Sequence, residues 1–160
     1  MILQLDDWKF DIDMARTMEY SAAEAAEHCD CAYCRNFYAA VDEAAPELRG
    51  FLVKFGVDIE APEEMLPMID GDIMYDPTYR VYGKILQYGQ YEMQVGLSNA
   101  IARTPENQQD YFLLDCFEVI IPWVLDEPLE EVISPANEPS LLKKMWDRFL
   151  GKIRKQGLDC

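Results

Sequence analysis

The sequence has few basic residues and no long apolar segment. Lysine and arginine number 14 against 30 acidic residues, which gives a net charge of -16. Such a chain repels nucleic-acid phosphates, so we expect no direct nucleic-acid binding and favour a basic protein or a cation as partner. No window approaches the roughly 18 apolar residues of a spanning helix, and the first residues lack the basic start of a secretion signal. We therefore expect no membrane span and a cytoplasmic location.

The familiar catalytic motifs are also missing. The chain contains no Walker loop, no GxGxxG, no nucleophile elbow and no HExxH, so no catalytic residue is assigned. A site assembled from distant residues would leave no such motif, which keeps an enzyme open. A non-catalytic binding or interaction protein with an acidic surface is the favoured hypothesis. In its sharper form the acidic side chains imitate nucleic-acid phosphates and inhibit a nucleic-acid-binding protein. The partner's identity and the oligomeric state are not predicted.

The composition is that of a folded domain. Half of the 160 residues are apolar, which is typical of one globular unit of this length. Alternating apolar residues predict β structure over residues 2–13. A capping-box pattern at Ser21 predicts a helix that runs to Pro46, and residues 47–56 predict a second helix closed by Gly56. We expect a single acidic α+β domain over residues 1–160, with an antiparallel sheet and helices packed on one face.

The second half predicts more strands. Residues 57–77, with three prolines and several acids, are typical of a loop. Residues 79–88 predict a strand that a Gly89-Gln90 turn joins to residues 91–95 as a hairpin. Residues 104–110 are typical of a polar loop, and residues 111–124 predict a central strand in which Asp115 and Glu118 need partners. Glu118, if buried, would be a candidate general acid with a raised pKa.

The last 20 residues carry six basic side chains against two acids. Apolar residues recur there at helical spacing, which predicts a closing amphipathic helix whose Trp146 and Phe149 belong to the core. Docking of this helix on the acidic remainder of the chain is favoured over a role as a tether to membranes or nucleic acid.

Residues 28–34, His-Cys-Asp-Cys-Ala-Tyr-Cys, hold three of the five cysteines and the one histidine. If this segment is helical, Phe37 and Val41 lie on the core face, and His28, Cys31 and Cys34 stand three apart and face one another. One imidazole and two thiolates would suit zinc, with Cys116 or Cys160 as a distant fourth ligand.

Two other interpretations of the segment stay open. Cys31 and Cys34 form a CxxC pair, which is a redox motif when it stands at the start of a helix. Alternatively, the segment is an ordinary helix with reduced, partly buried thiols. Arg35 and Asn36 are expected to be surface groups or to support the thiols from nearby.

The strings HCDCAYCRNFYAAVDEAAPELRGFLVKFGVDIEAPEE and IIPWVLDEP together resemble a group of small uncharacterised proteins from anaerobic gut Firmicutes. These proteins share an HCxCxYCRNFY-type stretch. The resemblance implies a bacterial source, but it brings no activity, catalytic residue or ligand set.

Overall fold

The computed structural model describes residues 1–70, 72–108 and 110–129. The chain divides into two compact units, Met1–Val124 and Leu125–Cys160, and the sheet and helices below belong to the first. The predicted C-terminal helix, with Trp146 and Phe149, and Cys160 lie outside the described residues. The single domain over residues 1–160 therefore stays a prediction.

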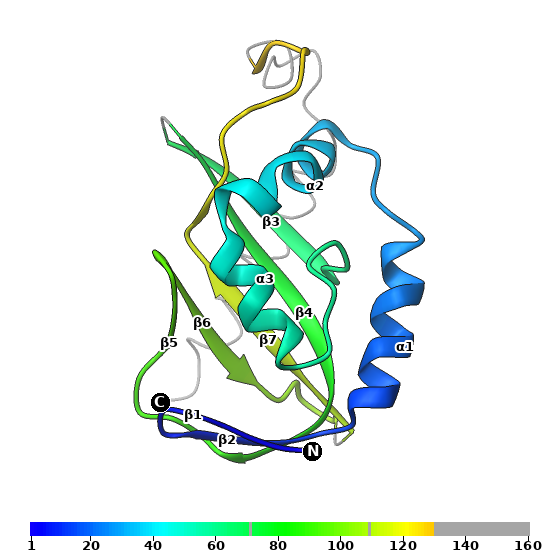
Figure 1. Cartoon of the computed structure of the whole chain (residues 1–160), viewed down its shortest axis with the longest axis vertical. Coiled ribbons are helices and arrows are strands. Elements are labelled where there is room, and N and C mark those ends of the chain that lie inside the picture. Colours follow the sequence, from blue (N-terminus) through cyan, green and yellow to red (C-terminus); the bar gives the residue numbers. More distant parts are fainter. Residues whose placement is uncertain (71, 109, 130–160) are drawn as a thin grey trace, which may run out of the picture. The chain divides into compact units, whose positions relative to one another are not determined.

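The first unit is an antiparallel sheet with three helices, which confirms the predicted α+β class (Figure 1). Along the sheet the order is β1-β2-β4-β7-β6-β5, and β3 and β8 also pair with β4. The strands are β1 Ile2–Leu5, β2 Trp8–Ile12, β3 Glu64–Asp70, β4 Asp72–Gln87, β5 Met93–Val95, β6 Ser98–Arg103, β7 Tyr111–Phe117 and β8 Val119–Ile120. The helices are α1 Met14–Ala25, α2 Ala32–Ala44 and α3 Pro46–Val53. Among the described residues, none of the helices qualifies as a membrane-spanning segment.

The predicted β structure near the N-terminus is confirmed. The hairpin of β1 and β2 turns at Asp6 and Asp7, where the apolar alternation changes phase, and Asp6 takes a positive φ of 51°. Trp8, Phe10 and Ile12 are buried, because alternate side chains of a strand lie on one face. Phe10 packs against the rings of two more core residues, Phe55 and Phe112.

The long helix predicted from Ser21 to Pro46 is wrong, because two helices occupy this stretch. Asp13 caps α1 through a hydrogen bond from the Arg16 amide at 3.1 Å, so the first helix begins well before Ser21. Ser21 is buried inside α1, and its hydroxyl accepts a hydrogen bond from the Asp58 amide. The chain leaves the helix after Ala25 and enters α2 only at Ala32.

The helix predicted at residues 47–56 is confirmed as α3, and Gly56 lies beyond its end with φ 77°. The predicted loop at residues 57–77 is wrong, because β3 and the first part of β4 form a hairpin there. Pro67 lies in β3, whose only strand partner among the described residues is β4. Proline is tolerated on such an edge strand, where one row of amides makes no ladder hydrogen bonds.

The hairpin predicted at Gly89-Gln90 is also wrong, since β5 pairs with β6 rather than β4. Gly89 instead lies against the indole of Trp8, where an added Cβ would come within 2.1 Å of Trp8 Nε1. The turn that reverses the chain is at Gly96, whose φ is 62°. Pairing of β5 with β6 is the more local solution, because Val95 and Ser98 are separated by only two residues.

The strand predicted at residues 111–124 is interrupted at Glu118, which has a φ of 58°. The carboxylate of Asp76 accepts the Glu118 amide at 3.0 Å and holds this kink, so that β7 and β8 both pair with β4. The buried Asp115 in β7 has the partners that its position requires. The Thr78 hydroxyl donates to it at 2.8 Å, and Arg103 forms an ion pair with it.

Candidate functional site: a cluster of three cysteines

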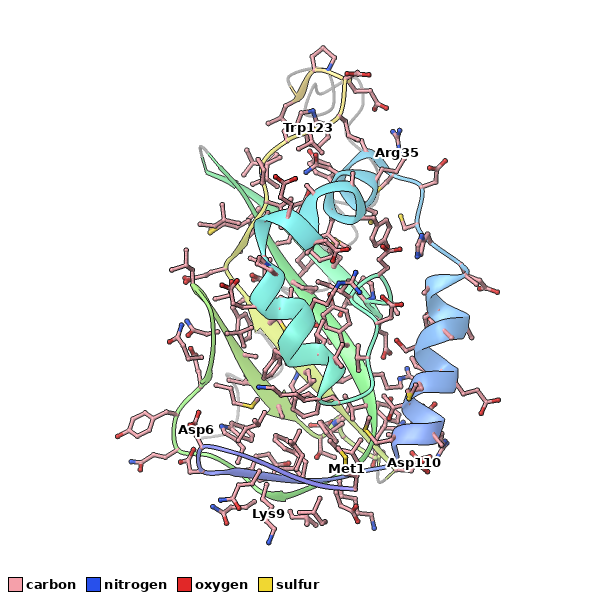
Figure 2. The ribbon with its side chains drawn as sticks, viewed as in Figure 1. Met1, Asp6, Lys9, Arg35, Asp110 and Trp123 are labelled. Carbon is pink, nitrogen blue, oxygen red and sulfur yellow. The ribbon has the colours of Figure 1, made fainter. Side chains whose placement is uncertain are left out.

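The three cysteines of the 28–34 segment form the one group of potential metal ligands found among the described residues. The sulfurs of Cys29, Cys31 and Cys34 all lie within 4.8 Å of one another, and none is in a disulfide. Cys29 and Cys31 come from the connection between α1 and α2, and Cys34 comes from the first turn of α2. Figure 2 labels Arg35 and Trp123, which lie at the end of the unit where α2 begins.

Cys31 occupies the N-cap position of α2, with extended dihedrals of φ -73° and ψ 155°. At this position the first amide groups of the helix are free to bind an anion. The hydrogen bond from the Cys34 side chain lowers the pKa of Cys31 to about 5, helped by the Cys34 amide, the Cys29 side chain and the Tyr33 amide. Burial acts in the opposite direction and is outweighed. These interactions favour the thiolate form of Cys31, which is the exposed member of the Cys31–Cys34 pair.

The half-buried Cys34 keeps its proton. Its hydrogen bond to Cys31, together with burial and the negative charge of that sulfur, raises the pKa of Cys34 above its ordinary value. Burial and the neighbouring sulfur charges likewise raise the pKa of Tyr38, whose hydroxyl shares a hydrogen bond with Cys34. The cluster therefore combines one thiolate with at least one protonated thiol, a typical arrangement for paired cysteines at a helix start.

A buried side chain holds the start of α2 in place, and no sequence pattern predicted its burial. Asn36 has no exposed surface, so of its two expected positions the one on the surface is wrong. Its amide group donates to the Pro122 carbonyl at 3.0 Å and to the Tyr75 hydroxyl at 3.2 Å, and its oxygen accepts the Val124 amide at 2.8 Å. The Tyr75 hydroxyl in turn donates to the Tyr33 carbonyl at 3.0 Å. This network ties the first turn of α2 to β4 and to the chain beyond β8.

The remaining residues of the motif divide between the core and the surface. Phe37 and Val41 are fully buried, and Phe37 packs on the Tyr75 ring at 5.3 Å between centroids. Arg35 forms a 3.6 Å ion pair with Asp30. The string Cys-Arg-Asn-Phe thus places a sulfur, a surface cation, a buried polar anchor and a core ring on four successive positions of one helix.

His28 lies beside the cluster rather than within it. Its ring stacks on Tyr38 at 4.4 Å, and its Nε2 is 3.7 Å from a carboxylate oxygen of Glu60. The grouped ligands therefore differ from the predicted set of His28, Cys31 and Cys34, since Cys29 takes the third place. The prediction assumed helical spacing, but residues 28–30 are not helical, so residues three apart need not face one another. Recognition of Asp13 as a helix cap would have placed the start of α1 but not the break after Ala25.

Two other sequence candidates do not join the cluster. Cys116 is 1% exposed in β7, where burial raises its pKa, and it is not one of the grouped ligands. Glu118 is exposed at the kink after β7, so the proposal of a buried general acid is wrong.

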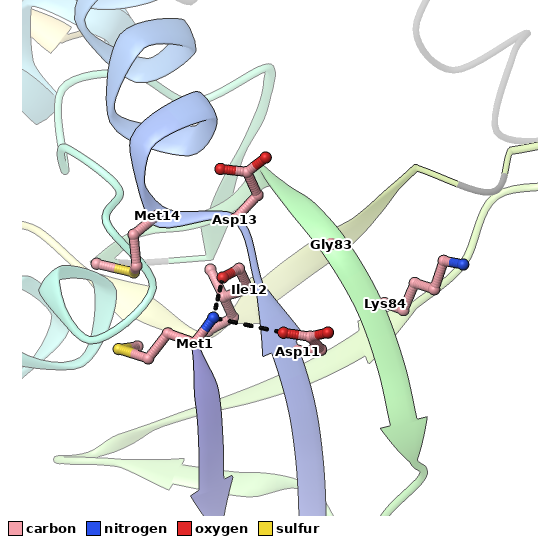
Figure 3. A pocket seen from close by; sticks show the side chains of 7 residues that line it. All are labelled: Met1, Asp11, Ile12, Asp13, Met14, Gly83 and Lys84. Carbon is pink, nitrogen blue, oxygen red and sulfur yellow. Dashed lines mark hydrogen bonds and ion pairs between the residues drawn. The ribbon is translucent and has the colours of Figure 1, made fainter.

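A pocket of about 520 Å³ lies where α1 begins, at the opposite end of that helix from the cysteines (Figure 3). The N-terminal ammonium of Met1 lies at its wall, 3.4 Å from the Asp11 carboxylate and 2.6 Å from the Ile12 carbonyl. Gly83 and Lys84 of β4 contribute the other side. These contacts of the Met1 ammonium hold the first residues against β2, so their role is structural.

The assignment of the thiolate to Cys31 predicts its reactivity. Alkylation by iodoacetamide should follow an apparent pKa of about 5 at Cys31, because the thiolate is the nucleophile. The rate should therefore rise as pH increases through that value and be nearly constant above pH 7, while Cys34 stays unreactive. Mass spectrometry of quenched, digested samples measures each residue, and the buried Cys116 is an internal control. Joint titration of Cys31 and Cys34 near pH 8.5 would contradict the assignment.

Comparisons with protein-family models, with curated proteins and with solved structures each found no match, so the chemistry that the site can perform follows from its own geometry.

Proposed function

We propose that the protein binds one thiophilic metal ion, zinc in the first instance, through Cys29, Cys31 and Cys34. The observation that carries this proposal is the approach of three reduced sulfurs to within 4.8 Å of one another. Zinc–thiolate bonds of about 2.3 Å in a tetrahedral site separate the sulfurs by about 3.8 Å. Small side-chain rotations therefore suffice to bring the three sulfurs onto one ion.

The electrostatics of the cluster support the same function. The lowered pKa of Cys31 favours its thiolate, so metal binding has to displace fewer protons. Three thiolates around a divalent ion leave one net negative charge, and the N-terminus of α2 stabilises negative charge at Cys31. Soft thiolate donors favour zinc or copper(I) over magnesium or calcium. The exposure of Cys29 and Cys31 gives the ion a path to the site.

The cluster supplies three ligands, whereas structural zinc sites usually have four. The fourth position is thus available to water or to a donor from another molecule. Phe37 and Val41 anchor α2 in the hydrophobic core. We therefore expect the metal to add little to folding and to exchange readily. The hypothesis of an acidic surface that binds a basic partner stays a prediction from the net charge.

The test measures metal binding by the full-length chain and by variants in which one cysteine at a time is replaced. Protein purified under reducing conditions should take up one zinc per chain in competition with a chromophoric chelator. The substitutions Cys29→Ser, Cys31→Ser and Cys34→Ser should each weaken binding about 100-fold or more, since even outer-shell changes around metal sites cost about 10- to 100-fold.

The matched control is Cys116→Ala, which removes a thiol that is outside the cluster and should leave the affinity unchanged. Circular dichroism of each variant verifies that the fold persists. A zinc stoichiometry near zero in the reduced wild-type protein, or an equal loss of affinity in Cys116→Ala, would reject the proposal.

A further inference from the structure

Two of the three clustered cysteines also have the arrangement of a reactive dithiol. Cys31 is the N-cap of α2 and Cys34 lies in the first turn of the same helix. Their sulfurs lie within 4.8 Å of each other. Residues three apart at the start of a helix are near the Cα separation of about 4.4–6.8 Å that disulfides require. The Cys29 sulfur also lies within 4.8 Å of both, but Cys29 precedes the helix, in the connection from α1.

We propose that this site is also a redox-controlled metal release device, in which a low-molecular-weight disulfide oxidises Cys31 and Cys34 to an intramolecular disulfide and thereby frees the ion. The inference rests on the proposed metal binding and adds its regulation. The dithiol reaction itself requires only the two cysteines and can occur in the metal-free protein.

Exposure assigns different roles to the two sulfurs. Cys31 is exposed, so a small disulfide can reach it, whereas Cys34 is half-buried. Cys31 is the N-cap of α2, where the free amide groups of the first turn stabilise negative charge. Cys31 is therefore the sulfur that attacks first, and Cys34 is the one that then resolves the mixed disulfide.

The exchange balances in two steps. The Cys31 thiolate attacks one sulfur of the small disulfide, so a bond forms to Cys31 and one small thiolate leaves and takes up a proton. Cys34, which is a thiolate in the zinc-loaded protein and gives up its proton to solvent in the metal-free protein, then attacks the Cys31 sulfur and expels the second small thiolate. The two protein sulfurs are oxidised and the small disulfide is reduced to two thiols.

Oxidation leaves the metal with one thiolate of this cluster, that of Cys29. A single thiolate does not hold zinc against solvent, because protein zinc sites use three or four protein ligands. A reductant that restores the two thiols restores the site, so release is reversible.

The experiment treats zinc-loaded and metal-free protein with glutathione disulfide. Free cysteines are then capped with iodoacetamide, and a protease cleaves before Asp30. Such cleavage separates Cys29 from Cys31 and Cys34. We expect a fragment beginning at Asp30 that is two mass units lighter, with Cys29 capped. The amount of bound zinc, measured with a chromophoric chelator, should fall from one per chain to near zero. It should return to one per chain after reduction.

Two variants keep this inference separable from metal binding. Cys29→Ser should bind zinc weakly yet still form the Cys31–Cys34 disulfide, whereas Cys34→Ser should stop at a mixed disulfide with glutathione on Cys31. If reduced wild-type protein binds no zinc but forms the disulfide, metal binding fails and with it the release device, while the dithiol chemistry stands. If zinc binds and no Cys31–Cys34 disulfide forms, or if zinc stays bound after it forms, the release device is overturned and the metal site remains.

Discussion

The substitution Gly83→Ala is expected to lower the free energy of unfolding by roughly 3 kcal/mol or more, because the residue combines a positive φ with a backbone contact. Gly83 has φ 138°, which residues with a side chain rarely adopt. An added Cβ would lie 2.0 Å from the Asp11 carbonyl oxygen and 3.0 Å from the Ile12 Cα. These atoms belong to β2, which pairs with β4 at this point, so relief of the clash requires the two strands to separate.

Urea unfolding monitored by tryptophan fluorescence measures this effect, and Gly50→Ala is the matched control. Gly50 lies within α3 and has no atom within 4 Å of an added Cβ. Alanine there should stabilise the protein by about 0.5–1 kcal/mol, because glycine is a poor helix former. Equal midpoints for the two variants would show that β2 does not approach β4 as closely as described.

The substitution Asn36→Ala is expected to cost about 2–4 kcal/mol, because it breaks a buried hydrogen-bond network. The change removes both donors and the acceptor of a side chain with no exposed surface. The Pro122 carbonyl and the Val124 amide lose their partner, and the Tyr75 hydroxyl loses a donor. An unsatisfied buried polar group costs about 1–3 kcal/mol, and the cavity adds to this.

Asn99→Ala is the control, since this asparagine is half-buried in β6 and its side chain makes no hydrogen bond among the described residues. The free energy of unfolding of this variant should differ from that of the wild type by less than about 0.5 kcal/mol. Asn36→Ala should in addition raise the alkylation rate of Cys34, because the first turn of α2 loses its attachment to β4 and to residues 122–124. An Asn36→Ala variant as stable as Asn99→Ala would show that the network is not formed.

Local patterns were sufficient for some elements. The N-terminal strands, α3 with Gly56 beyond its end, the polar loop before β7 and the α+β class follow from apolar periodicity, turn residues and the choice of glycine. Each of these depends on contacts within a few residues, so the amino-acid order alone determines them. The same reasoning identified the cysteine-rich segment as the place where chemistry should be sought.

Tertiary structure decided the elements whose partners are distant in sequence. An alanine-rich stretch looks equally helical on both sides of residues 26–31. The Asp13 cap sets the start of α1, and the Asn36 network fixes α2 against residues far along the chain, so the break lies between them. Gly89, predicted as a turn residue, instead lies against Trp8, a contact between residues far apart in the sequence. The grouping of Cys29 with Cys31 and Cys34 follows from the break, because only a non-helical connection turns all three sulfurs toward one point. The sequence by itself determined which residues are available for chemistry, and the folded chain decided which of them meet.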